Sequence, residues 1–334
     1  MASGLTKFGN DLYTGERSVP FVPLRRIWLT IAAVLMLAAI AVPFIRGGGD
    51  FGAGFNFGIE FRGGSQFQVS EASSIDPDIA TEAVHSVVPD ATVRVTTVGA
   101  DGVRVQTDQL TDKQTIAVSG NLREAYDTDE VSSSFIGATW GADITQSALR
   151  ALGVFVVIAL IFMALYFRTW KMSIAAILKL AHDLILTVGV YAATGWEITP
   201  AAVIGFLTIL GYSLYDTVVV FDKVRENTSE LGDESNRTFG EAVNLAVNQT
   251  LIRSINTGVV AALPVAAILF IGAFALGADT LRDISLALLV GTIVGTYSTP
   301  AFGAPLYSLF REGEPEIAKR DKRVLQSRGA AVAA

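Results

Sequence analysis

The fold of this chain is decided by the stretch TPAAVIGFLTILGYSLYDTVVVFDKVREN, residues 199–227. From Pro200 to Phe221 it is apolar for long enough to cross a bilayer, which needs about 20 residues at a rise of about 1.5 Å each. Asp216 lies inside this run, although a carboxylate at bilayer depth costs about 2.5–3.5 kcal/mol on insertion scales. Charges resume at Asp222, where a helix would leave the membrane. The stretch therefore predicts a membrane span with one acid that needs a partner or a function.

The composition favours a protein with several such spans. Of the 334 residues, 51% are hydrophobic and 17% are charged, a balance too apolar for an ordinary soluble protein. The chain has no cysteine, which excludes disulfides, thiolate metal sites and cysteine nucleophiles. Its 2 histidines leave little material for a zinc site, and no Walker-type loop for ATP is present. We therefore expect no enzyme activity, no cofactor, no metal and no nucleic-acid partner.

Six apolar runs predict six membrane-spanning helices. They cover residues 27–45, 149–167, 172–194, 200–221, 252–276 and 284–310. The first run follows a polar N-terminal segment, residues 1–26, and a cleaved signal peptide is the alternative interpretation. The run is longer than a usual signal core and no A-x-A site follows it, so we expect a retained anchor. Residues 149–310 form one membrane domain with the other five spans.

The long polar segment between the first two spans, residues 46–148, predicts a small α+β domain. Its strand-like and helix-like stretches alternate in the order βαββαβ, the ferredoxin-like arrangement. They cover residues 66–69, 77–88, 92–98, 103–107, 111–126 and 130–136. Glycines at its start, residues 47–54 together with Gly63 and Gly64, are expected to act as hinges that let the domain move as a unit.

Two further segments are expected at the inner surface of the membrane. Residues 222–249 are charged and amphipathic, with Phe239, Val243 and Ala246 at helical spacing, which predicts a helix lying along the membrane surface. The tail, residues 311–334, is basic and ends in alanines, so we expect it to be disordered.

Lysine and arginine orient the chain, because they concentrate on the cytoplasmic side of membrane proteins. They are frequent in residues 1–26, 168–171, 222–249 and 311–334, whereas the short loops 195–198 and 277–283 hold only Arg282. We therefore expect both termini in the cytoplasm and residues 46–148 outside the cytoplasmic membrane.

Charged and small residues inside the spans are candidates for function or packing. Lys179, His182 and Asp183 fall at i, i+3 and i+4 and share one helix face. Two interpretations stay open: a self-neutralising pair beside a hydrogen-bonding histidine, or a polar face that marks an ion pathway. Gly291 and Gly295 form a GxxxG pair, which predicts close helix packing or a subunit contact.

Asp216 has candidate hydrogen-bond partners on its own helix in Tyr212, Ser213 and Tyr215. A carboxylate held by such partners for purely structural reasons is one interpretation. Arg253 begins the fifth span within a turn of the inner surface, where a long basic side chain can also reach lipid phosphates.

Several motifs resemble those of the SecD/SecF family of protein-export membrane proteins, in particular its SecF branch. They are GIEFRGG (58–64), FIGATWGADITQSA (135–148), FRTWKM (167–172), LAHD (180–183), GYSLYDTVVVFDKVREN (211–227), NQTLIRS (248–254) and GTYSTP (295–300). The resemblance covers residues 25–309. The sequence departs from the family pattern at Ala138, where proline is frequent, and at Lys179, where an apolar residue is usual.

The resemblance implies a six-helix bundle similar to half of a resistance-nodulation-division (RND) transporter. It implies pairing with SecD, work beside the SecYEG channel on unfolded polypeptide, and use of the proton-motive force across the lipid bilayer. Asp216 and Arg253 match the family's proton-pathway residues. The alternative is a proton-driven RND-type small-molecule transporter, although such proteins normally carry two six-span halves in one chain. An intramembrane aspartyl protease needs a second aspartate in the next span, and residues 252–276 contain none.

Overall fold

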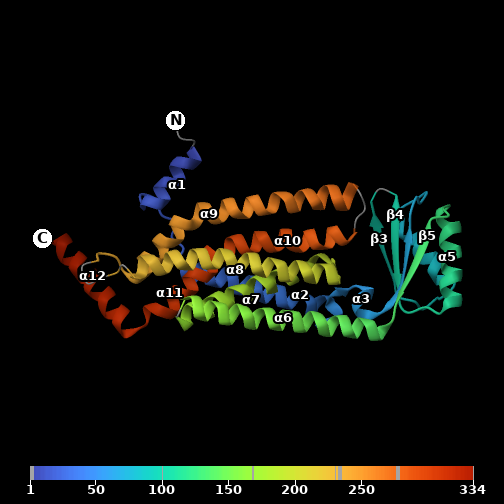
Figure 1. Ribbon diagram of the computed structural model, residues 1–334, viewed down its shortest axis with the longest axis horizontal. Helices are drawn as coiled ribbons and strands as arrows, with labels where there is room; N and C mark the ends of the chain where they lie inside the picture. Colours follow the sequence, from blue (N-terminus) through green and yellow to red (C-terminus); the bar gives the residue numbers. More distant parts are fainter. Residues whose placement is uncertain are drawn as a thin grey trace.

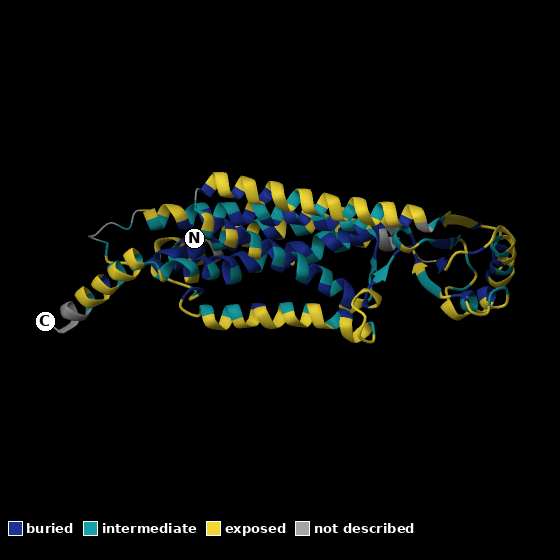
Figure 2. Cartoon of the chain, turned by 90° about the horizontal axis from the view of Figure 1, so that it is seen from below, coloured by how far each residue is buried: buried dark blue, intermediate teal, exposed yellow. Residues whose placement is uncertain are grey.

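A bundle of long helices carries a sheet domain at the end away from both termini in the computed structural model (Figure 1). The structure describes residues 4–99, 101–167, 169–229, 231, 235–275 and 279–333. Within those residues, 6 helices are long and apolar enough to cross a membrane. Their exposed residues cover the outer faces of the bundle and their buried residues lie where helices meet (Figure 2). The expectation of a multi-pass helical membrane protein is confirmed.

The spans are α2 (Arg25–Arg46), α6 (Ala138–Phe167), α7 (Trp170–Thr194), α8 (Pro200–Ser229), α9 (Phe239–Ala267) with the π-helical η2 (Ile268–Ala275), and α10 (Asp279–Ser298) with η3 (Thr299–Gly303) and α11 (Ala304–Glu312). The described part of each predicted run lies within one helical span, but two spans begin earlier than predicted, α6 at residue 138 instead of 149 and α9 at residue 239 instead of 252. Pro300 lies in the π-helical turn of the last span, because proline lacks the N–H that a regular α-turn needs. Arg168, Leu276 and the first two residues of the 277–283 loop lie outside the described residues.

The separate surface helix expected within residues 222–249 is wrong. Helix α8 continues to Ser229, and Phe239 begins α9, which runs without a break into the fifth span. The apolar side chains of Phe239 and Val243 are buried against Tyr307 and neighbouring residues of the bundle. Their hydrophobic face is therefore used for internal packing, which joins the amphipathic segment to the span that follows it.

The expectation of a disordered tail is also wrong. Residues 315–333 form helix α12 (Pro315–Ala333), which contacts the start of α9. Asp321 accepts a hydrogen bond from the backbone N–H of Phe239 at 3.0 Å, and Arg328 pairs with Glu241 at 2.8 Å. The tail is ordered because its charges find partners on the first turn of α9. A further short helix, α1 (Gly4–Thr14), also packs near α9.

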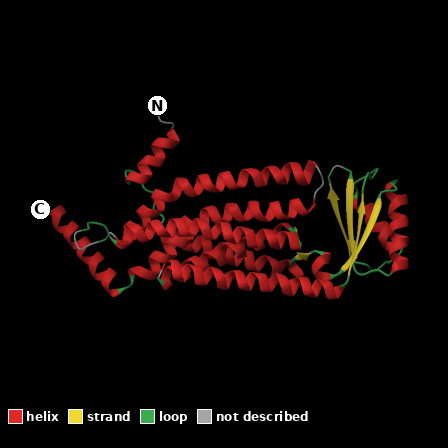
Figure 3. Ribbon diagram, viewed as in Figure 1, coloured by secondary structure: helices red, strands yellow, loops and turns green. Residues whose placement is uncertain are grey.

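The sheet domain has the element order β2 (Gly64–Val69), α4 (Pro77–His85), β3 (Val93–Val98), β4 (Gly102–Thr107), α5 (Asp112–Tyr126) and β5 (Val131–Ile136) (Figure 3). Its four strands are antiparallel in the order β3-β4-β2-β5. Phe67, Val105 and Leu122 are fully buried in its core. Successive strand residues point to opposite faces, so Arg104 and Gln106 leave this core on the other side of β4, where they are also buried.

Residues 47–62 pack on the bundle and connect it to the sheet domain. They form η1 (Gly52–Gly54), the short strand β1 (Asn56–Phe57) and helix α3 (Ile59–Arg62). Strand β1 pairs in parallel with β6 (Glu197–Ile198), which lies between α7 and α8. The backbone N–H groups of Gly47 and Gly49 bond to the end of α2. Gly63 and Gly64 have φ of 78° and 145° and join α3 to β2, so they occupy the junction where a change of direction needs glycine.

Candidate functional site

The inward face of α8 carries the buried polar residues of the fourth span. Ser213, Asp216 and Thr217 lie at i, i+3 and i+4, and all three are buried. This spacing places them on one side of the helix, toward α7, α9 and α10. Tyr215, between them in sequence, is 55% exposed and points to the outside of the bundle. Tyr212 is half-buried one turn before Asp216.

One of the two carboxyl oxygens of Asp216 has a hydrogen-bond partner. The hydroxyl of Ser254, on α9, donates to Asp216 Oδ1 at 2.7 Å. The other oxygen, Oδ2, is buried and has no hydrogen-bond partner among the described residues. Buried polar atoms normally have partners. Asp216 therefore keeps one buried acceptor atom unfilled among the described residues.

Arg253 precedes Ser254 on α9 and does not contact Asp216. Its side chain is exposed, and its Nη2 donates to the hydroxyl of Tyr215 at 3.4 Å. Adjacent residues of a helix point about 100° apart, so α9 directs Ser254 inward and Arg253 outward. The structure thus brings Asp216 together with Ser254, and places Arg253 beside Tyr215. The sequence does not single out Ser254, because a serine inside an apolar span has no distinguishing charge.

Lys179, Asp183 and Ser213 form a closed set of polar contacts between α7 and α8. Lys179 Nζ lies 2.8 Å from Asp183 Oδ2 and 2.7 Å from Ser213 Oγ. The Ser213 hydroxyl donates to Asp183 Oδ2 at 2.5 Å. All three side chains are at most 3% exposed. The geometry favours the self-neutralising pair, since each charge is compensated inside the bundle.

His182 extends this cluster toward the last span. Its Nδ1 lies 3.1 Å from Asp183 Oδ1, and its Nε2 lies 3.3 Å from the hydroxyl of Tyr297. The imidazole stacks on Phe302, with ring centroids 4.7 Å apart. Asp183 therefore has partners on both oxygens, in contrast to Asp216. Within the described residues, no group of three or more histidine or acidic side chains is arranged to hold a metal ion.

The GxxxG pair makes room for these contacts on the facing helix. A Cβ at Gly291 would overlap the side chain of Ile209 on α8. A Cβ at Gly295 would lie 3.7 Å from Ser213 and 3.8 Å from Asp183 Oδ2. Both glycines of α10 face neighbouring helices of this chain, so they contribute to close packing inside the bundle.

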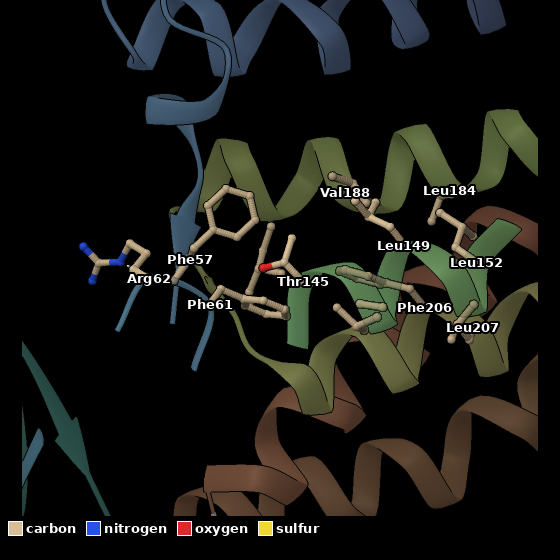
Figure 4. A pocket seen from close by; sticks show the side chains of 13 residues that line it. Phe57, Phe61, Arg62, Thr145, Leu149, Leu152, Leu184, Val188, Phe206 and Leu207 are labelled. Carbon is tan, nitrogen blue, oxygen red and sulfur yellow. Dashed lines mark hydrogen bonds between the residues drawn. The ribbon is translucent and has the colours of Figure 1, made fainter. Parts of the chain in front are cut away.

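An apolar cavity of about 310 Å³ lies at the end of the bundle near the sheet domain. Phe61, Leu149, Leu184 and Phe206 are among its lining residues. Figure 4 shows the guanidinium of Arg62 pointing away from the other lining side chains. The cavity shares no residue with the buried polar cluster, and its lining side chains are apolar except for Arg62 and Thr145.

Two family models match the sequence. The model described as "Protein export membrane protein SecD/SecF, C-terminal" matches residues 117–312. The SecD/SecF GG motif matches residues 51–70, which include the segment that packs on the bundle before the sheet domain.

Similar proteins are named as translocase subunits. Protein translocase subunit SecF of Streptomyces coelicolor is 40% identical over 98% of this chain and 86% of its own. The subunit of the same name from Mycobacterium tuberculosis is 39% identical over 97% of this chain and 74% of its own. The crystal structure of SecDF, a translocon-associated membrane protein from Thermus thermophilus, aligns with a TM-score of 0.76 and 27% identity. That match covers 89% of this chain and 39% of the SecDF chain.

Proposed function

The chain belongs to the SecD/SecF family of protein-export membrane proteins, and from this we propose that it uses proton flow to help move unfolded polypeptide across the cytoplasmic membrane. It acts beside a SecYEG-type channel, as the SecF-type half of a larger assembly. The buried Asp216, with one oxygen bound to Ser254 and the other without a partner, is the observation that carries the proton-driven part of the proposal.

Asp216 binds and releases the proton in this mechanism. Low dielectric favours the neutral acid, and hydrogen bonds or cations near the carboxylate favour the charged form. A shift of α9 against α8 would change both the Ser254 contact and the approach of Arg253, and thereby the charge of Asp216. Arginine does not deprotonate in proteins, so Arg253 biases the charge of Asp216 and does not carry the proton. One charge crossing about 100 mV releases about 2.3 kcal/mol, which is enough to shift a two-state bundle.

The partner is a SecD-type subunit that packs against the outer face of α8 and α9. This face has exposed polar side chains at membrane depth, whereas lipid disfavours such groups. They are Thr208, Tyr215, Arg253 and Asn256. A neighbouring helix that presents an acid would pair Arg253 and complete the proton pathway. The matched SecDF chain supports this partner, because this chain aligns with only 39% of its length.

The sheet domain is proposed to be a ferredoxin-like module on the outer side of the membrane. Its strand order β3-β4-β2-β5, with two helices in βαββαβ succession, supports the ferredoxin-like assignment. Its position at the end of the bundle away from both termini agrees with the lysine and arginine distribution (Figure 1). In this place the domain would contact polypeptide that emerges from the channel. These contacts would be weak and non-specific.

Reconstituted vesicles test the proposal. The chain, its SecD-type partner and the export channel are placed in one vesicle, and export is measured with and without a proton gradient. We expect Asp216→Asn to leave folding and assembly intact and to abolish the gradient-dependent acceleration. Asp222→Asn is the matched control, since Asp222 lies on the same helix with a side chain that is 48% exposed. Full gradient-dependent export by the Asp216→Asn protein would refute the proton role of this residue.

A further inference from the structure

The sheet domain is attached to the bundle by a buried ion pair, in addition to its two chain connections. Arg104 Nη1 lies 3.7 Å from Glu197 Oε2. Arg104 comes from the face of β4 that points away from the domain core, and Glu197 from β6 between α7 and α8. The two side chains are 8% and 13% exposed. The pair therefore forms only when the sheet domain is docked on the bundle.

Glu60 on α3 places a second carboxyl group beside this pair. Glu60 Oε2 and Glu197 Oε1 are both buried and have no hydrogen-bond partner among the described residues. The two oxygens border the same space next to Gly58: a Cβ there would overlap Glu60 Oε2 and lie 3.3 Å from Glu197 Oε1. Gly58 has a φ of -62° and a ψ of 162°, an extended conformation that any residue can adopt. A side chain at this position would have to displace the carboxyl group of Glu60.

Among the described residues, acids outnumber cations around Glu60. Two other carboxylates, Glu197 and Asp283, and one cation, Arg104, act on it. Burial, with a smaller contribution from the negative charge of Glu197, raises the pKa of Glu60. Among the described residues, the other charged groups near this junction are Arg282, which pairs with Asp283, and Arg94, which interacts electrostatically with Glu197, Arg62 and Asp108. Arg104 can compensate one neighbouring carboxylate but not two.

Water can reach this junction. An open cavity of about 640 Å³ lies between the sheet domain and the bundle, and Glu60, Arg104 and Asp283 line it. Thr199 closes one side, where its hydroxyl donates to Asp283 Oδ2 at 2.8 Å. A proton can therefore exchange between Glu60 and solvent without passing through the core of either domain.

We propose that Glu60, Glu197 and Arg104 form a proton-operated latch that holds the sheet domain on the bundle. With a proton on Glu60, Arg104 pairs with the charged Glu197 and the domain is docked. When Glu60 loses this proton, two adjacent buried carboxylates compete for one guanidinium and the contact opens. The latch goes beyond the proton site at Asp216 and rests on the proposed function only for its use during export.

The sign of the pH dependence follows from linkage. Glu60 has its ordinary pKa when the domain is undocked and exposed to water, and a raised pKa when it is docked. Docking is therefore strengthened below the undocked pKa and is weakened as the pH rises through the docked pKa. The ratio of docked to undocked molecules changes about tenfold for each unit by which docking raises the pKa of Glu60.

Distances between two spin labels measure the latch directly. The chain has no native cysteine, so cysteines can replace Ile116 on α5 and Leu149 on α6, which are 73% and 65% exposed. The full chain is placed in lipid nanodiscs, and the label distances are recorded between about pH 5 and pH 9, on both sides of the ordinary carboxyl range. We expect one short, narrow distribution at low pH and a second, longer one that grows as the pH rises.

Variants at the latch, with one control, distinguish opening of the latch from a general loss of stability. Glu60→Gln imitates the protonated acid, so it should stay docked at all pH values and lose the pH response. Arg104→Glu should undock the domain, and adding Glu197→Arg should restore docking. Lys113→Gln, an exposed change on α5, should behave like the parent chain. Label distances that do not change with pH, or a Glu60→Gln protein with the parent pH response, would overturn the latch.

The latch and the proposed function can fail independently. Asp216→Asn should abolish gradient-dependent export in vesicles and leave the pH response of the label distances intact. If the parent chain shows no gradient-dependent export, the proposed function is wrong. The label distances alone decide whether the latch exists.

Discussion

Ser254 and Asp216 face each other across the contact between α9 and α8, with the Ser254 hydroxyl 2.7 Å from Asp216 Oδ1. This contact is the only hydrogen bond to the Asp216 side chain among the described residues, because Oδ2 is unpartnered. The acid at the centre of the proposed proton pathway is thus held by a neutral hydroxyl, and its cation, Arg253, is directed to the outer face of α9.

Removing the Ser254 hydroxyl should cost stability. Removing one partner of a buried hydrogen bond leaves the other polar atom unsatisfied, which costs about 1–3 kcal/mol. We expect Ser254→Ala to lower the free energy of unfolding by this amount, and Ser254→Thr, which keeps the hydroxyl, to lose much less. Thermal unfolding in detergent compares the two variants. Equal stability of the alanine and threonine proteins would show that this contact contributes nothing.

Loss of one partner of the buried Lys179–Asp183 pair should lower the free energy of unfolding much more than loss of both partners. Lys179→Met leaves the Asp183 carboxylate without its cation, and breaking a buried pair in this way costs about 3–5 kcal/mol. The double variant Lys179→Met with Asp183→Asn removes both charges and should recover most of that loss. A double-mutant cycle on the free energy of unfolding measures the coupling. Additive effects would contradict the ion pair seen at 2.8 Å.

Close packing at Gly291 should not tolerate a methyl group. A Cβ there overlaps Ile209, and overpacking of this kind costs about 1–3 kcal/mol. Gly153 on α6 is the matched control, because it is exposed and nothing lies within 4 Å of its added Cβ. We expect Gly291→Ala to destabilise the protein and Gly153→Ala to leave it unchanged or stabilise it by up to about 1 kcal/mol. The reverse order in a thermal unfolding series would argue against this helix contact.

The orientation in the membrane can be tested with single cysteines. Asp101, in the turn between β3 and β4, and Lys322, on α12, are both exposed and lie at opposite ends of the molecule (Figure 1). In intact cells, an impermeant thiol reagent should label a cysteine at position 101 and not one at position 322. After the cells are opened, both should react. Labelling of position 322 alone in intact cells would invert the proposed topology.

The helical spans could be predicted from the sequence because they depend on a local property. A run of about 20 apolar residues is driven into a helix across the bilayer whatever its neighbours are. The strands of the sheet domain follow in the same way from local alternation, as in β4, where Val103 and Val105 face the core and Arg104 faces away. The helices of this domain begin at residues with capping side chains, Asp76 and Thr111.

The Lys179–Asp183 pair follows from its i, i+4 spacing on one helix, whereas the partners of Asp216 and Glu197 were decided only by the tertiary structure. Which residue of α9 meets Asp216 depends on the rotation of α9 about its axis. A rotation by one residue, about 100°, would place Arg253 opposite Asp216 in place of Ser254. The pairing of Glu197 with Arg104 depends on how the sheet domain is placed on the bundle, across 93 positions in sequence. Apolar periodicity determines which face of a helix is buried. It carries no information on which polar group of another element lies opposite, because that choice is made by the packing of the whole chain.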